Sequence, residues 1–177
     1  MDVDSYIKHY EKRKNWTHLE WPKHQARLRR CSSYLEGWDF ADVGCAFGYS
    51  TYYLSTFKPG YWTGIDFSKR AIKGASKNFP DIKFKFLDSI GDLGKLDSFD
   101  SVVCSGTIEH IEDDRVLVKG LLEITQKKLV ITTPCVPVVA VGHLRLYSEE
   151  MLMNLFNGLY YEISKDDYSW YVVIGYA

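Results

Sequence analysis

An acidic residue followed by a glycine-bearing turn stands out at 42–48, with the sequence Asp-Val-Gly-Cys-Ala-Phe-Gly. Gly44 and Gly48 let a chain that leaves a strand turn sharply and let a ligand approach the backbone, because no Cβ blocks φ > 0. In doubly wound α/β folds, a strand, such a turn and a helix N-terminus form a corner where free backbone N–H groups face a nucleotide. The segment therefore predicts a cradle for a small ligand.

The spacing and charge of this turn narrow the choice of ligand. Its glycines are arranged as G-x-x-x-G, whereas dinucleotide-binding turns have G-x-G-x-x-G, and the carboxylate of Asp42 would repel phosphate. A ligand with a cation suits it better. Asp66 ends the next expected strand, roughly 20 residues beyond the glycines, the offset at which an acidic side chain accepts hydrogen bonds from ribose hydroxyls. An adenosine without a phosphate chain fits both signals.

Several motifs together make the chain resemble class I S-adenosylmethionine-dependent methyltransferases, in particular the small type 11 and type 23 groups. The resemblance extends from residue 37 to the C-terminus, and it implies an enzyme that uses S-adenosylmethionine and releases S-adenosylhomocysteine. The family often has Gly where this chain has Ala46, a change that narrows the turn without abolishing it. The motifs are Asp42 to Gly48, Gly64-Ile65-Asp66, Leu87-Asp88-Ser89, Phe99 to Ser105, and Ile108-Glu109-His110-Ile111.

The resemblance implies cofactor-binding roles for residues at strand ends. Asp42 would hold the ammonium of the methionine part, usually through water, Asp66 the ribose hydroxyls, and Asp88 the amino group of adenine. Any one aspartate at a strand end is more commonly a cap or turn residue, and Phe67 could stack on adenine or belong to the core. Backbone or ring contacts would come from Gly44, Cys45, Ala46, Gly48, Phe67, Ser89, Ile90 and Ser105.

Glu109, His110 and His143 are the candidate catalytic residues. Because the cofactor carries its own activated methyl group, the enzyme mainly has to align the reactants, and it needs a base only where the acceptor loses a proton. A histidine titrates near neutral pH and can take a proton from a hydroxyl while a carboxylate orients it. The alternative is that these residues hold the loops around the site.

The same three residues could form a divalent-metal site. Related families that methylate RNA 3′ ends or quinone-precursor hydroxyls have Glu-x-x-Glu-His at this point and a later histidine. This chain has Gly106 where the first glutamate would stand. Because a metal needs its full ligand set, we expect no metal here.

Strands and helices alternate with short connections, which favours a parallel sheet. The resemblance implies a Rossmann-like fold with helices on both faces and seven strands in the order 3-2-1-4-5-7-6, the last antiparallel. The helix at 113–125 should turn its apolar residues Val116, Leu117, Leu121, Leu122 and Ile124 inward. We expect helices at 5–14, 22–36, 48–57, 69–78 and 113–125, a short helical turn within 91–98, and a last helix that Ser148 caps. We expect strands at 39–43, 61–65, 82–87, 101–104, 128–132, 160–164 and 170–176.

Length and composition indicate one globular domain over 1–177, with a helical arm at 1–36 and the Rossmann-like core at 37–177. The longest apolar run, 135–141, contains a proline and is too short to span a bilayer. The N-terminus carries Asp2 and Asp4 and has no secretory signal, so we expect a cytoplasmic protein without a membrane partner. The four cysteines form no C-x-x-C pair and are expected to be free thiols. The oligomeric state is not predicted.

The first 30 residues hold eight Lys or Arg against four Asp or Glu, with interleaved aromatic residues. Such an arm could follow a nucleic-acid backbone, but the charge is modest, and an amphipathic helix that packs on the domain is favoured. Residues 104–107 lack the Asn/Asp-Pro-Pro-aromatic motif of base N-methylating families. We therefore expect O-methylation of a small molecule. RNA methylation at a ribose or an end, and a non-catalytic S-adenosylmethionine-binding domain, are the alternatives.

Overall fold

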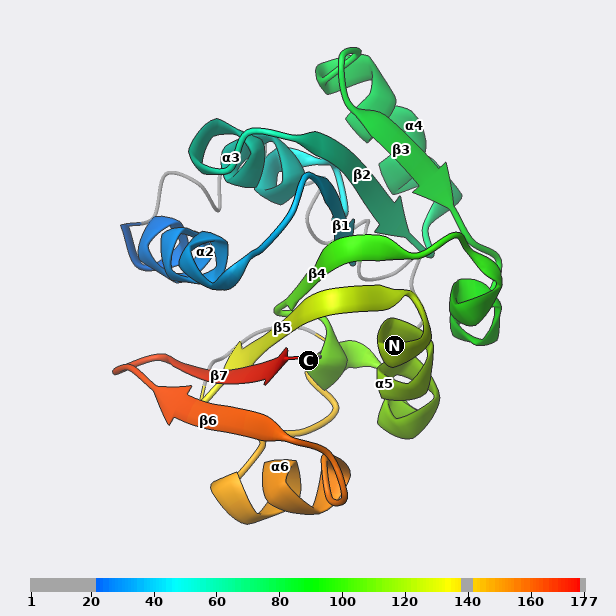
Figure 1. The fold of residues 1–177 in the computed structure, drawn as a ribbon. Coiled ribbons are helices and arrows are strands. Elements are labelled where there is room, and N and C mark those ends of the chain that lie inside the picture. Colours follow the sequence, from blue (N-terminus) through cyan, green and yellow to red (C-terminus); the bar gives the residue numbers. More distant parts are fainter. Residues whose placement is uncertain (1–21, 138–141, 176–177) are drawn as a thin grey trace.

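The computed structural model describes residues 22–137 and 142–175. The expected helix at 5–14 lies outside these residues. Seven strands form one sheet in the order β3-β2-β1-β4-β5-β7-β6, as the sequence predicted, and β7 runs antiparallel to both of its neighbours (Figure 1). The strands are β1 Asp39–Val43, β2 Tyr61–Asp66, β3 Lys83–Phe86, β4 Phe99–Ser105, β5 Thr125–Pro134, β6 Tyr161–Lys165 and β7 Ser169–Gly175.

Helices cover both faces of the sheet (Figure 1). On one face, α2 and α3 enclose an apolar cluster that includes Leu28, Leu54 and Phe40. On the other face, α5 and α6 pack over a larger cluster that includes Leu121, Leu152 and Ile131. The helices are α2 Pro22–Tyr34, α3 Tyr49–Phe57, α4 Lys69–Asn78, α5 Asp114–Glu123 and α6 Glu149–Leu155, with short 3₁₀ helices η2 Ile90–Lys95 and η3 Ile108–His110.

The inward face of α5 differs from the predicted one at one position. Val116 is 36% exposed, whereas Val118 is buried together with Leu117 and Leu121. The Asp113 side chain caps the helix by accepting a hydrogen bond from the Val116 N–H at 3.1 Å. This cap places Val116 in the first turn, on the solvent side, and the inner stripe begins one residue later.

Strand β5 is longer than predicted because it has partners on both sides. Its first residue pairs with Phe99 of β4, and its last, Pro134, pairs with Ser169 of β7. Pro134 is tolerated at this terminal position, where a missing N–H costs no ladder hydrogen bond within the strand. Ser148 caps α6 as expected, accepting a hydrogen bond from the Met151 N–H at 3.2 Å.

The parallel register brings the carboxyl ends of the central strands to one edge of the sheet. Asp42 of β1 lies beside Gly64 of β2 and Val103 of β4, and Asp66 lies beside Phe86 of β3. The segments that follow these strands must therefore meet at this edge. Ligands bind at this edge in open α/β sheets.

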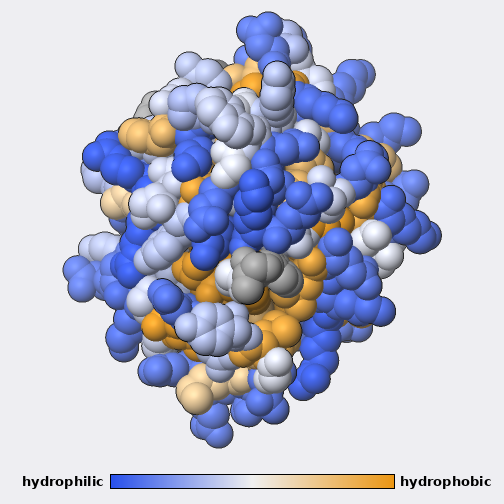
Figure 2. Space-filling view, in the orientation of Figure 1, coloured by the Kyte–Doolittle hydropathy of each residue, from blue (hydrophilic) through white to orange (hydrophobic). Residues whose placement is uncertain are grey.

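Hydrophilic residues cover most of the face seen in Figure 2, and hydrophobic residues gather near its middle. Within the described residues, no helix combines the length and the apolar character needed to cross a membrane. All four cysteines are free thiols, as predicted; three are buried and Cys135 is partly exposed.

Candidate cofactor and active site

The turn after β1 depends on its glycines. Gly44 and Gly48 have φ values of +84° and +83°, which favour glycine. A Cβ on Gly44 would lie 2.0 Å from the Thr107 hydroxyl oxygen, and one on Gly48 would lie 2.6 Å from the Phe84 ring. Among the described residues, Ala46 is the one non-glycine with positive φ, at +47°. This turn is therefore close-packed and, at Ala46, strained.

The backbone N–H groups of this turn are already used within the protein. Those of Gly44 and Cys45 donate to the Ile65 carbonyl at 2.8 and 3.1 Å, and that of Gly48 donates to the Cys45 carbonyl at 2.9 Å. The Ala46 N–H donates to the Asp66 carboxylate at 2.8 Å. The expectation of free N–H groups at these positions is therefore wrong. A ligand that donates hydrogen bonds, such as an ammonium, suits the turn better than one that accepts them.

Asp42 lies behind this turn, 1% exposed. One of its carboxylate oxygens accepts hydrogen bonds from the Ser50 and Thr51 hydroxyls at 2.6 and 2.7 Å, which joins β1 to the first turn of α3. Burial raises the pKa of Asp42 to about 6; the two hydroxyls act against this shift, and the charge of Asp66 adds to it. In this position Asp42 would act on a bound ammonium through its charge or through water.

Asp66 connects the end of β2 to the glycine turn. Its two oxygens accept the N–H groups of Ala46 and Ser68, both at 2.8 Å. Burial raises its pKa, and these backbone donors lower it again. Since each carboxylate oxygen has a second lone pair, Asp66 can still accept two hydroxyl hydrogens. Phe67, which follows it, is partly buried against the core cluster that includes Ile65.

The segment after β3 meets Asp66 from the other side. The Leu87 N–H donates to the Asp66 carbonyl at 3.1 Å. Asp88 is exposed, Ser89 caps η2 by accepting the Gly91 N–H at 3.1 Å, and Ile90 is partly buried. The structure thus brings the three aspartates predicted from strand ends to the same edge of the sheet.

Glu109, His110 and His143 meet beyond the end of β4. Glu109 is 2% exposed, and its carboxylate accepts a hydrogen bond from the Thr133 hydroxyl at 3.2 Å. The His110 and His143 rings lie edge to face with centroids 4.7 Å apart. Ser105, also predicted, forms a hydroxyl–hydroxyl contact of 2.9 Å with Thr132 of β5, which fixes the strand end beside this group.

Burial controls the charge of this group. It raises the pKa of Glu109 and lowers the pKa values of His110 and His143, while the charge of Glu109 partly restores that of His143. His110 Nδ1 lies 2.9 Å from the Gly142 carbonyl oxygen, which can only accept. Nδ1 of the neutral ring must therefore carry the hydrogen, and Nε2 keeps a lone pair that can take a proton.

The loop that carries His143 is tied to the rest of the site by residues that the sequence did not assign to it. The Leu144 N–H donates to the Glu109 carbonyl at 2.8 Å. Arg145 forms an ion pair with Asp114 at the start of α5, and the Tyr147 hydroxyl donates to the same carboxylate at 2.8 Å. Arg145 and Tyr147 thus anchor the loop that carries His143. Holding this loop was the alternative to a catalytic role in the sequence analysis.

The group offers three possible metal ligands but no fourth. Ligand atoms of Glu109, His110 and His143 lie within 4.8 Å of one another, a grouping that could hold a metal ion, whereas a structural tetrahedral zinc site has four protein ligands. Gly106 offers no fourth side chain. A Cβ there would lie 3.4 Å from the Arg27 guanidinium, a charge that repels a cation. No catalytic step is assigned to a metal.

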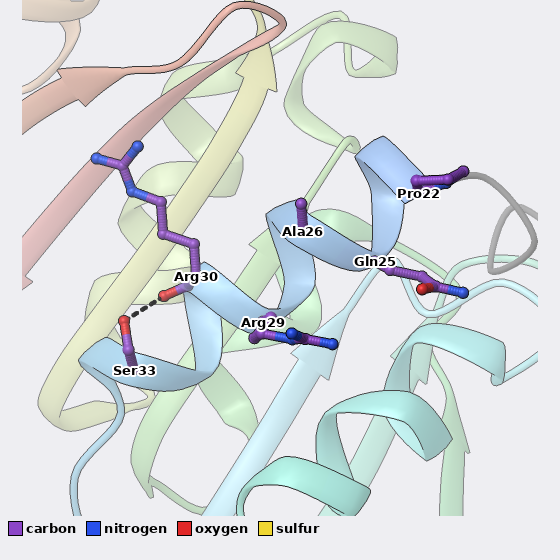
Figure 3. A pocket seen from close by; sticks show the side chains of 6 residues that line it. All are labelled: Pro22, Gln25, Ala26, Arg29, Arg30 and Ser33. Atoms are coloured by element: carbon purple, nitrogen blue, oxygen red, sulfur yellow. Dashed lines mark hydrogen bonds between the residues drawn. The ribbon is translucent and has the colours of Figure 1, made fainter.

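A pocket of about 430 Å³ lies elsewhere, along one side of α2 (Figure 3). None of its lining residues is a predicted site residue, and it is away from the strand ends. Its lining consists of Pro22, Gln25, Ala26, Arg29, Arg30 and Ser33.

The sequence matches the model of a methyltransferase domain family over residues 40–127. No curated protein matches the sequence. Among solved structures, the chain is similar to a SAM-dependent methyltransferase from Aquifex aeolicus, with 16% identity, a TM-score of 0.72, and coverage of 94% of this chain and 96% of that one. It is also similar to magnesium protoporphyrin IX methyltransferase from Synechocystis with bound SAM, with 17% identity, a TM-score of 0.67, and coverage of 87% and 80%.

A third similar structure is the [4+2]-cyclase SpnF, with 16% identity, a TM-score of 0.65, and coverage of 80% of this chain and 59% of that one. At these identities the structures establish the fold, while the family match, which begins at β1 and includes the glycine turn, Asp66, Asp88 and the Glu109-His110 pair, concerns the sequence itself. The chain therefore belongs to the class I S-adenosylmethionine-dependent methyltransferases.

Proposed function

We propose that the protein transfers the methyl group of S-adenosylmethionine to an oxygen of a small-molecule acceptor, with His110 as the base. The observation that carries this proposal is the pairing of two imidazoles with a buried carboxylate directly beyond β4, beside Ser105 and Gly106. An oxygen acceptor must lose its proton as it is methylated, and a neutral imidazole that carries its hydrogen on Nδ1 has a basic lone pair on Nε2 that is suited to take it.

Bound S-adenosylmethionine would supply a methyl group that its sulfonium has already activated. The residues of this chain then have three tasks. Asp66 holds the ribose hydroxyls, and Asp42 places negative charge near the ammonium. His110 would accept the hydroxyl proton of the acceptor on Nε2 during the transfer. Gly142, by accepting the Nδ1 hydrogen, fixes the tautomer that makes this possible.

The described part of the basic arm favours a small acceptor over nucleic acid. The Arg29 guanidinium lies 5.1 Å from the centre of the Phe57 ring, and that of Arg30 lies 4.1 Å from the Tyr171 ring and donates to the Ser164 hydroxyl at 2.8 Å. These charges serve contacts within the protein. The similar Synechocystis structure is a methyltransferase of magnesium protoporphyrin IX, a small molecule, which supports the same class of acceptor.

The test of the first step is equilibrium binding of S-adenosylmethionine to the wild type and to Asp66→Ala. We expect the wild type to bind and the variant to bind about 10- to 100-fold more weakly, since it loses two hydrogen bonds to a charged group. No binding by the wild type would contradict the whole proposal.

The second step needs its own test, because the similar cyclase shows that this fold hosts other reactions. Labelled methyl transfer into a fractionated metabolite extract would identify the acceptor. His110→Asn keeps an N–H donor for the Gly142 carbonyl but removes the basic nitrogen, so it separates catalysis from loop anchoring. With the identified acceptor, we expect turnover to fall by about 10²- to 10⁴-fold and cofactor affinity to hold. Full turnover in His110→Asn would overturn the base assignment, and transfer to a base nitrogen of RNA would overturn the acceptor class.

A further inference from the structure

The charged groups at the strand ends account for only part of the cofactor. S-adenosylmethionine carries an ammonium, a carboxylate and a sulfonium, and the strand ends offer it the acids Asp42, Asp66 and Asp88. None of these can bind a carboxylate. The N–H groups of Gly44, Cys45, Ala46 and Gly48 are used internally, and the hydroxyls of Ser50 and Thr51 in the first turn of α3 already bind the carboxylate of Asp42. The carboxylate of the cofactor therefore needs a cation from another element.

Arg27 of α2 supplies a cation at the right place. A Cβ on Gly106 would lie 3.4 Å from its Nη2 and 3.6 Å from its Nη1. The next residue, Thr107, would be struck by a Cβ on Gly44. The guanidinium is thus one residue away from the contact between the β4 end and the glycine turn, where the methionine part of the cofactor is expected to lie.

Within the described residues, this guanidinium is only partly satisfied. Nη2 lies 3.0 Å from His24 Nδ1, but among the described residues Nε of Arg27 is the one buried side-chain nitrogen or oxygen without a hydrogen-bond partner. No described acid lies within ion-pair distance of it. A buried donor without a partner costs about 1–3 kcal/mol, so a missing ligand is a physical explanation for this position.

Glu109 does not serve as that partner. Its Oε1 approaches the same Cβ position on Gly106 at 3.6 Å, yet the two charged groups form no ion pair. The charge of Arg27 only partly offsets the increase that burial causes in the pKa of Glu109. The guanidinium and the carboxylate therefore both lie near Gly106, but farther apart than the partners of an ion pair.

We infer that Arg27 binds the carboxylate of the methionine moiety of S-adenosylmethionine. The inference rests on the proposed function, because it needs this cofactor in the cradle. A guanidinium can hold a carboxylate with two parallel hydrogen bonds, which a lysine cannot reproduce. Helix α2 is then part of the cofactor site.

The test compares two ligands that differ by this carboxylate. Affinities of S-adenosylmethionine and of its decarboxylated form are measured by titration calorimetry for the wild type, Arg27→Gln and Arg29→Gln. Arg29 is a matched control, because it lies on the same helix in the pocket of Figure 3, away from the strand ends. Arg27→Lys keeps the charge without the paired donors, and thermal unfolding shows whether each variant is folded.

We expect Arg27→Gln to bind S-adenosylmethionine about 10- to 100-fold more weakly than the wild type, the range for a hydrogen-bonded charge. Its affinity for the decarboxylated form should stay within about twofold, Arg27→Lys should fall between, and Arg29→Gln should match the wild type. An equal loss for both ligands, or none for either, would overturn the inference, as would a loss of acceptor turnover with unchanged cofactor affinity. If the wild type binds neither ligand, the proposed function itself fails.

Discussion

Asp42→Asn should change how the stability of the protein depends on pH. Burial places the pKa of Asp42 at about 6, against an ordinary value of 3.8. Because the folded pKa is raised, the folded state binds the proton more tightly than the unfolded chain does. The contribution of this group to stability is therefore fully present below pH 3.8 and is lost as the pH rises through 6. Two pKa units correspond to about 3 kcal/mol.

The asparagine side chain keeps an oxygen that can accept from Ser50 or Thr51, but it has no charge to desolvate. Urea unfolding of both proteins between pH 4 and pH 7 measures the difference. We expect the free energy of unfolding of Asp42→Asn, relative to the wild type, to rise by about 2.4 kcal/mol over this range, since part of the full effect is already lost at pH 4. The other titratable groups contribute equally to the stability of both proteins, so they cancel in this difference. Asp100 is one of them; Lys127 and two backbone N–H groups lower its pKa to about 2. Parallel pH curves for the two proteins would refute the reasoning.

Three further predictions concern the turn and the histidine group. Ala46→Gly should stabilise the protein by about 0.5 kcal/mol in urea unfolding, since relief of the left-handed strain exceeds the added entropy of the unfolded chain; a loss of stability would contradict this. The acid limb of the pH profile for methyl transfer should lie below pH 6.5, because burial lowers the pKa of His110; a limb above 6.5 would argue against His110 as the base. Treatment with EDTA should leave turnover unchanged, and a loss restored by zinc would show that Glu109, His110 and His143 hold a metal.

The parallel central sheet and the strand-end acids could be predicted because they depend on local pattern, whereas the strand order was an implication of the family resemblance. Alternation of strand and helix sets a parallel sheet, and a parallel sheet places Asp42, Asp66 and Asp88 at one edge whatever the details of packing. Helix phase is less secure. The inner side of α5 carries Val118 beside Leu117 and Leu121, whereas the predicted Val116 is exposed.

Other features of the site depend on contacts between residues distant in the chain. Nothing near Arg27 in the sequence indicates that its guanidinium reaches Gly106, some 80 residues later. The pairing of His110 with Gly142 likewise requires the loop after β5 to return over η3. The sequence did show candidate residues there, since Glu109, His110 and His143 have the right chemistry. Their proximity, and the use of the N–H groups of the glycine turn within the protein, needed the structure.

Burial shifts the pKa values of the acidic and the basic side chains of the site in opposite directions. It raises the pKa values of Asp42, Asp66 and Glu109 and lowers that of His110, so these side chains tend toward their neutral forms when no ligand is bound. A ligand with an ammonium and a sulfonium reverses this tendency for the carboxylates, because nearby positive charge favours their ionised form. Binding of S-adenosylmethionine should therefore release protons.

The release should be largest near pH 6, where Asp42 is about half protonated in the free protein, and smaller at pH 7. Calorimetric titrations in two buffers of different ionisation enthalpy measure it as a difference in apparent binding enthalpy. Asp42→Asn should reduce that difference, while Arg29→Gln should leave it unchanged. Equal enthalpies in both buffers at pH 6 would mean that the carboxylates are already ionised in the empty site, and that burial does not set its charge.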